Sequence, residues 1–132
     1  MNNKNWEECP RDAKESRWAS LYATLYPTGE IIISRFTFEA LGEPQACLLL
    51  YDRESRTIGL KPARTSVEPN AYPLRSRGRH GGQIIRGYRL CREFGIHMFE
   101  TVKFPRAEID RDGILLLDLN HTRTAARMRA GG

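Results

Sequence analysis

Short apolar runs, bounded by glycine, proline or charged residues, follow one another along most of the chain. Runs of this length that are separated by polar turns are typical of β-strands and hairpins. Ala46–Tyr51 and Thr57–Lys61 enclose one such turn, and Ile114–Leu119 follows a second turn at Asp110–Gly113. An Asp-Gly pair in a hairpin turn indicates two residues with positive φ. The pattern therefore predicts a mainly β protein.

Two segments between these strands have the composition of short helices. They are Arg35–Leu41 and Tyr88–Phe94, each about two turns long. Ser34 is suited to cap the first helix, because its hydroxyl can accept a hydrogen bond from the backbone of the first turn. A glycine follows each helix and permits the left-handed conformation that ends many helices. The fold class expected from the sequence is mainly β with two short helices.

An internal repeat connects the two halves of the chain. Gly29–Gly42 aligns without a gap on Gly82–Gly95, at an offset of 53 residues and with four identities. A strand-like run precedes each segment, at Trp18–Leu25 and Ala71–Arg75, and two more runs follow each one. In the second half, the first of these is Thr101–Phe104, extended to Ile109. The sequence predicts a duplicated strand–strand–helix–strand–strand unit, with copies at 18–63 and 70–119.

Two leucine-rich runs indicate how the strands are packed. Cys47–Leu50 and Ile114–Leu117 show little alternation between apolar and polar residues. Strands of this kind are buried on both faces, as in a small closed barrel. We therefore expect one globular domain at 18–119, formed by the two repeats as a small barrel. Residues 1–17 are expected to form an N-terminal arm, and residues 120–132 a basic tail.

Composition supports an ordinary globular protein of one domain. The chain has 132 residues, of which 40% are hydrophobic and 28% are charged, and this is enough to bury a core without disulfides. No apolar run approaches the length of a membrane span, and the polar N-terminus does not resemble a secretory signal. Cys47 and Cys91 lie in apolar contexts, which favours a reducing compartment and a cytoplasmic location.

The positive charge is concentrated in the second half of the chain. Residues 1–68 have a net charge of −1, while residues 69–132 have +6, which gives the total of +5. Between Pro69 and Arg92 there are six arginines and no acidic residue. Such an asymmetry indicates an anionic partner.

Arginine offers a planar fork of donors that matches phosphate oxygens and guanine edges. Alternate spacing would place Arg75, Arg77 and Arg79 on one face of an extended segment. Arg89 and Arg92 are three residues apart, which favours one face of the second helix. In the first repeat, Arg35 is the corresponding contact. The candidate nucleic-acid contacts are Arg75, Arg77, Arg79, Arg86, Arg89, Arg92 and Arg35.

Other interpretations of this basic strip stay open. Its arginines can form a solvated surface, pair with the acids of the first repeat, or meet an acidic protein partner. A cleft between the repeats would support a third function, an enzyme. A homodimer is compatible with each of these.

Motifs for catalysis or cofactor binding do not emerge from the sequence. Arg79–Gly82 lacks the spacing and the Lys-Ser/Thr ending of a phosphate-binding loop. The turn at Asp110–Gly113 resembles the start of a calcium loop, but apolar residues, Leu115 and Leu117, occupy the next ligand positions. The three histidines do not have metal-ligand spacing. The sequence therefore predicts neither an enzyme nor a metal or cofactor.

Thr24 to Leu60 resembles the AbrB/SpoVT/MazE class of swapped-hairpin DNA-binding domains. The matching features are Gly29–Ile33, then Leu41 and Gly42 at the end of a short helix, then the following hairpin. Residues 82–119 repeat the pattern, which is similar to the tandem arrangement of the cell-division regulator MraZ. Ser34 follows Ile33 where that class usually has proline. The resemblance implies a cradle-loop or swapped-hairpin barrel, binding to double-stranded DNA and a role in transcription regulation.

Overall fold

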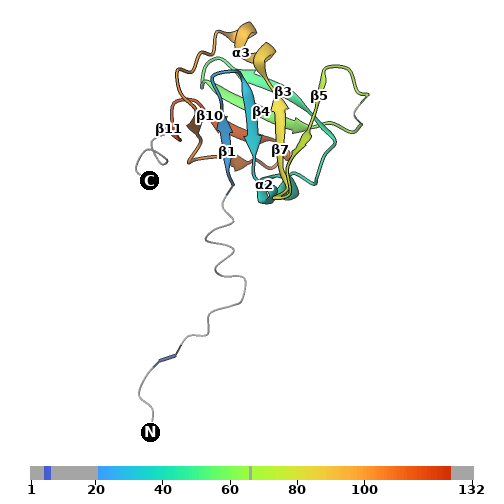
Figure 1. Cartoon of the computed structure of the whole chain (residues 1–132), viewed down its shortest axis with the longest axis vertical. Coiled ribbons are helices and arrows are strands. Elements are labelled where there is room, and N and C mark those ends of the chain that lie inside the picture. Colours follow the sequence, from blue (N-terminus) through green and yellow to red (C-terminus); the bar gives the residue numbers. More distant parts are fainter. Residues whose placement is uncertain (1–4, 7–20, 66, 126–132) are drawn as a thin grey trace.

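The computed structural model describes residues 5–6, 21–65 and 67–125. Two antiparallel β-sheets and two short helices form this part of the chain (Figure 1). The mainly β class with two short helices, expected from the sequence, is confirmed. The predicted arm at 1–17 lies outside the described residues except for 5 and 6, and so does the end of the predicted tail from residue 126.

The first sheet has six strands in the order β11-β8-β1-β2-β7-β6. Their bounds are Arg123–Thr124 (β11), Val102–Lys103 (β8), Ala23–Leu25 (β1), Glu30–Ile33 (β2), Gly82–Arg86 (β7) and Arg75–Arg77 (β6). Every pairing in this sheet is antiparallel. Within this sheet β2 pairs with β7, and these two strands come from different halves of the chain.

The second sheet has five strands in the order β5-β3-β4-β10-β9. Their bounds are Ala71–Pro73 (β5), Ala46–Asp52 (β3), Thr57–Pro62 (β4), Leu115–Asp118 (β10) and Glu108–Ile109 (β9). Here too all pairings are antiparallel, and β4 from the first half pairs with β10 from the second. Each sheet is therefore built around a pairing between the two halves.

The two helices lie at opposite ends of the molecule (Figure 1). α2 (Arg35–Ala40) follows β2 and α3 (Tyr88–Phe94) follows β7, and because β2 and β7 run antiparallel, the chain leaves them in opposite directions. The predicted cap of α2 is confirmed, since Ser34 Oγ accepts a hydrogen bond of 3.2 Å from the backbone N–H of Thr37. Gly95 ends α3 in the left-handed region, with φ of 67°.

The hydrophobic core lies between the two sheets. The first sheet contributes fully buried side chains such as Leu25, Ile31 and Ile85, and the second contributes Leu60 and Leu115. Each helix closes one end of this core, α2 through the buried Leu41 that follows it and α3 through Leu90. Burial of these apolar side chains is the main source of the fold's stability.

The closed barrel expected from the leucine-rich runs is not confirmed, because the described strands form two sheets that do not close. The expectation that these runs are buried on both faces is wrong. Leu115 and Leu117 are fully buried, whereas Leu116 between them is half-buried and Leu50 is 40% exposed. The runs alternate between the core and the outer face of the second sheet, but apolar residues occupy both faces, so the sequence shows no period.

Two strands expected to be single are divided between the sheets. In 71–77, β5 belongs to the second sheet and β6 to the first, with the break at Leu74, whose backbone N–H bonds to Gln45. The expected strand from Thr101 to Ile109 is divided in the same way into β8 and β9, and Pro105 lies between them. Residues 123–124 in the predicted tail form β11. In the turn at 110–113, Gly113 alone has positive φ.

Candidate functional site

The outer face of the six-stranded sheet carries a row of residues that crosses all six strands. Ile31, Ile33 and Ile85 point into the core, so their neighbours along each strand point outward. Paired residues in adjacent strands lie on the same face. The registers therefore place the following residues in one outward row, from β11 to β6: Arg123, Lys103, Thr24, Ile32, Ile84 and Arg75.

Further basic side chains lie on the same face above and below this row. Arg86 is two residues beyond Ile84 on β7 and pairs with Glu30 on β2, while Arg77 pairs with Gly82. Among the paired outer-face positions of this sheet, Glu30 is the one acidic residue. We define the basic sheet face as Arg75, Arg77, Arg86, Lys103 and Arg123.

An apolar strip runs between the basic side chains. Ile32 is only 7% exposed, although it is absent from the core cluster. The guanidinium Nη2 of Arg77 donates a hydrogen bond of 3.4 Å to the phenol oxygen of Tyr26. Tyr26 follows β1 and Arg77 belongs to β6, so this contact passes over β2 and β7. A tyrosine ring and a guanidinium therefore lie above the isoleucines, where they can present a stacking and hydrogen-bonding surface to a ligand.

All seven arginines predicted as contacts are exposed. Arg35 pairs with Glu39 at 3.0 Å, in the first turns of α2. The other six make no ion pair with a carboxylate in the part of the chain that the structure describes. Their charges are therefore available to an anionic partner.

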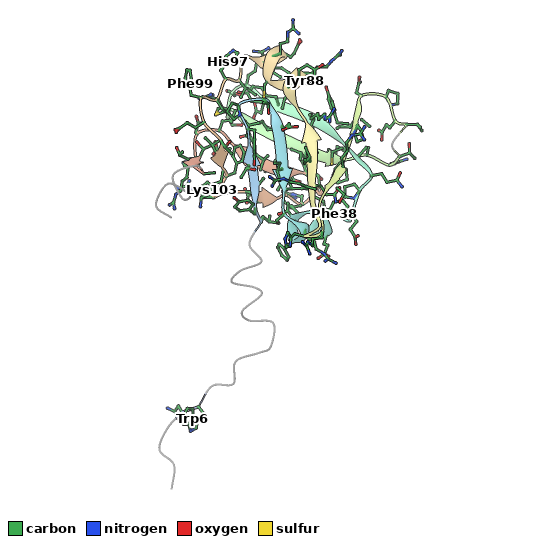
Figure 2. All side chains as sticks on the ribbon, in the orientation of Figure 1. Trp6, Phe38, Tyr88, His97, Phe99 and Lys103 are labelled. Carbon is green, nitrogen blue, oxygen red and sulfur yellow. The ribbon has the colours of Figure 1, made fainter. Side chains whose placement is uncertain are left out.

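The structure divides these arginines into three groups. Arg75, Arg77 and Arg86 share the outer face of the sheet. Arg79 lies in the turn between β6 and β7, which packs on α2, since a Cβ added to Gly81 would lie 2.6 Å from Cδ of Arg35. Arg89 and Arg92 belong to α3, at the opposite end of the molecule, where Figure 2 shows Tyr88 far from Phe38 of α2.

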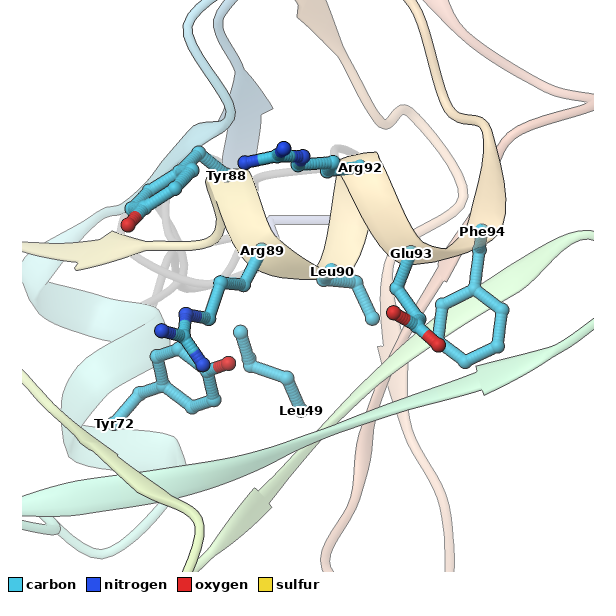
Figure 3. A pocket seen from close by; sticks show the side chains of 8 residues that line it. All are labelled: Leu49, Tyr72, Tyr88, Arg89, Leu90, Arg92, Glu93 and Phe94. Atoms are coloured by element: carbon cyan, nitrogen blue, oxygen red, sulfur yellow. The ribbon is translucent and has the colours of Figure 1, made fainter.

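A pocket of about 430 Å³ lies beside α3 (Figure 3). Arg89 extends toward Tyr72 from one side of the helix, whereas Arg92 lies on the other side, near Tyr88. The two side chains thus diverge (Figure 3), although residues three apart lie only about 60° from each other around a helix axis. The pocket is lined by Leu49, Tyr72, Tyr88, Arg89, Leu90, Arg92, Glu93 and Phe94.

Sequence reasoning missed three residues at the outer face of the six-stranded sheet. Lys103 and Arg123 reach the sheet through pairings of β8 with β1 and of β11 with β8, and Tyr26 reaches it through its contact with Arg77. No local signal identifies them, because these contacts join residues that are 20 to about 79 positions apart in the chain.

The two cysteines that the structure describes, Cys47 and Cys91, have the character of core residues. Cys47 is fully buried, and its burial raises the pKa of the thiol to about 12. Burial also raises the pKa of Cys91. Among the described residues there is no cluster of three histidine, cysteine or acidic side chains that would suit a metal ion. Within the same residues, neither helix is long or apolar enough to cross a bilayer.

Comparison with protein-family descriptions, with curated proteins and with solved structures gave no match to this chain.

Proposed function

We propose that this protein binds double-stranded DNA through the basic sheet face and acts as a transcriptional regulator. The observation that carries the proposal is the outward row on the six-stranded sheet, which has basic residues at both ends, with Glu30 as the one acid among the paired outer-face positions of the sheet. Cationic side chains on a rigid sheet fix the position of a duplex by contacting its phosphates.

The dimensions of the sheet suit a duplex. Six strands spaced about 4.8 Å apart place Arg123 and Arg75 roughly 24 Å from each other. This distance corresponds to about seven base pairs of B-DNA. Tyr26 and Arg77, which lie between these two ends of the row, can reach sugars or base edges. Arg79, in the turn that follows β6, extends the contact surface beyond the sheet.

We also propose that the fold arose by duplication and belongs with the AbrB-like tandem arrangement. In the pairing of β2 with β7, Ile31 lies opposite Ile85 and Ile32 opposite Ile84. In the alignment of the repeats Ile31 corresponds to Ile84 and Ile32 to Ile85, so the two pairs are equivalent. In the same register Glu30 lies opposite Arg86 and Ile33 opposite Gln83, and at the offset of 53 residues each of these pairs corresponds to the other. These reciprocal pairings support a two-fold relationship between the repeats, by which one chain can supply both halves of a DNA-binding surface.

A cytoplasmic location is part of the same proposal. Cys47 and Cys91 are free thiols, and unpaired cysteines are the rule in reducing compartments.

The proposal is tested by fluorescence anisotropy with a labelled duplex of mixed sequence at about 100 mM salt. The test variant replaces Arg75, Arg77 and Arg86 with alanine. The control variant replaces Lys61, Arg64 and Arg111, which are equally exposed and lie outside the basic sheet face. Both variants lose three positive charges, so they differ only in where the charge is removed.

We expect the test variant to bind about 100-fold more weakly than the wild type, since each lost phosphate contact costs several-fold in affinity at this salt concentration. The control variant should stay within about threefold of the wild type. Equal losses in the two variants, or no binding by the wild type, would overturn the proposal. A wild type that binds an acidic polypeptide but not the duplex would assign the basic sheet face to a protein partner.

A further inference from the structure

We propose that the pocket beside α3 binds one nucleotide, with its base against Tyr72 and its phosphate on Arg89. This site is separate from the basic sheet face, so the inference goes beyond the proposed function. The nucleotide can be a free mononucleotide or an unpaired nucleotide of a bound strand. Both sources present the same chemistry, a flat base and a phosphate.

The size and lining of the pocket fit a ligand of this kind. Its volume of about 430 Å³ falls in the range of small-molecule sites, which combine an apolar lining with a few polar groups. Leu49, Leu90 and Phe94 supply the apolar part. Tyr72 and Tyr88 supply two aromatic rings, and Tyr88 is 53% exposed. Aromatic rings that face solvent are suited to base stacking.

The charge of the pocket selects an anion. Arg89 and Arg92 carry two positive charges against the single carboxylate of Glu93. None of these three side chains has an ion-pair partner among the residues that the structure describes. A phosphate monoester carries nearly two negative charges at neutral pH, and guanidinium groups bind it with paired hydrogen bonds. A neutral aromatic ligand would leave Arg89 unused.

The walls of the pocket are held in place before any ligand arrives. The ring of Phe94 lies 4.9 Å from the ring of Tyr51, and the guanidinium carbon of Arg53 lies 4.9 Å from the Phe94 centroid. At the start of α3, the backbone N–H of Gly87 donates a hydrogen bond of 3.0 Å to the carbonyl of Gly29. A site that is already formed loses less entropy when it binds a ligand.

Tyr88 connects this pocket with the basic sheet face. It also lines a smaller pocket, of about 300 Å³, together with Thr28, Glu30 and Arg86. Arg86 belongs to the basic sheet face. A strand held on that face therefore has a path along Arg86 and Tyr88 into the pocket beside α3.

The test is a titration of ¹⁵N-labelled full-length protein, followed by NMR, with AMP, GMP, CMP and UMP in turn. Adenosine and inorganic phosphate are titrated separately. We expect at least one nucleotide to bind saturably, with shifts concentrated at α3 and Tyr72. Adenosine and phosphate should each bind about tenfold more weakly or worse, since each lacks one half of the ligand.

Variants locate the site. Arg89→Gln with Arg92→Gln should weaken nucleotide binding about tenfold or more. The matched pair Arg64→Gln with Arg111→Gln, which are exposed and lie outside both the pocket and the basic sheet face, should leave it unchanged. The inference is overturned by no saturable binding of any nucleotide, by phosphate that binds as tightly as the nucleotides, or by equal effects of the two pairs.

Duplexes with and without a single-stranded overhang distinguish the two sources. Tighter binding of the overhang, lost in the Arg89/Arg92 pair, assigns the nucleotide to a bound strand. Nucleotide binding with no preference for the overhang assigns a free mononucleotide. The proposed function can fail independently, because loss of duplex binding alone leaves the mononucleotide titration intact.

Discussion

Gly29 and Tyr88 are in backbone contact across the two halves of the chain. A Cβ added to Gly29 would lie 2.5 Å from Cα of Tyr88 and 2.9 Å from its backbone nitrogen. Gly29 also has a φ of 93°, a region that residues with a side chain rarely adopt. The turn between β1 and β2 therefore requires glycine for two reasons, and the start of α3 is fixed by this contact.

Replacing Gly29 with alanine should lower the free energy of unfolding by about 3 kcal/mol or more. The backbone of Tyr88 would have to move away from the added Cβ, and the alanine would have to adopt a strained φ. Gly42→Ala is the matched control, since Gly42 has a φ of 89° but no atom within 4 Å of the added Cβ. That control should cost about 1 kcal/mol. Urea denaturation measures both values, and equal losses would show that the contact with Tyr88 does not matter.

Thr37 ties α2 to the residue that precedes β1, Tyr22. Its buried hydroxyl accepts a hydrogen bond of 2.8 Å from the backbone N–H of Tyr22 and donates one of 3.1 Å to the Tyr22 carbonyl. Thr37→Val keeps the volume but leaves the backbone N–H of Tyr22 without this partner, whereas the Tyr22 carbonyl keeps the hydrogen bond of 3.1 Å from the backbone N–H of Ser34. We expect a loss of about 2 kcal/mol in thermal or urea unfolding. Thr57→Val, at an exposed hydroxyl, should change stability by less than about 0.5 kcal/mol.

Asp118 gives stability a dependence on pH. Its hydrogen bond to His121, with a further one from the backbone N–H of Asn120, lowers the pKa of the carboxyl group. A lowered pKa in the folded state contributes stability above the unfolded pKa of about 3.9, and this contribution is lost as pH falls through the folded value. Asp118→Asn should therefore be less stable than the wild type at pH 7, with the difference closing toward pH 3. A difference that stays constant across this range would contradict the assignment.

Cys47 should resist alkylation in the folded protein. Its thiol is fully buried, and its pKa is raised to about 12, so almost no reactive thiolate forms at pH 8. Cys91 is only half-buried and should react first. Peptide mapping after a short treatment with iodoacetamide distinguishes the two residues. Modification of Cys47 at the same rate as Cys91 would indicate that the two sheets open readily.

Local features of the fold could be predicted from the sequence. The bounds of α3 agree with the expected segment, and Ser34 caps α2 as expected, because capping and helix termination depend on residues a few positions apart. The assignment of strands to sheets could not be predicted in the same way. Leu74 and Pro105 each mark a point where the chain passes from one sheet to the other, and this passage depends on partners distant in sequence.

The candidate site shows the same limit. Arg75 and Arg77 were expected on one face because strand alternation is a local property, and the structure places them so. Lys103 and Arg123 join them only because β8 and β11 extend the sheet beyond β1. The separation of Arg89 and Arg92 from this face follows from the position of α3 at one end of the molecule, which depends on the pairing of β2 with β7.

The measurement that tests the central claim most directly is the salt dependence of duplex binding. The four arginines of the sheet face should give the wild type a slope of about −3.6 in a plot of log Kobs against log salt concentration. Replacing Arg75, Arg77 and Arg86 with alanine should reduce the magnitude of the slope by about 2.7. A slope that is the same in the wild type and the variant would contradict binding through the basic sheet face.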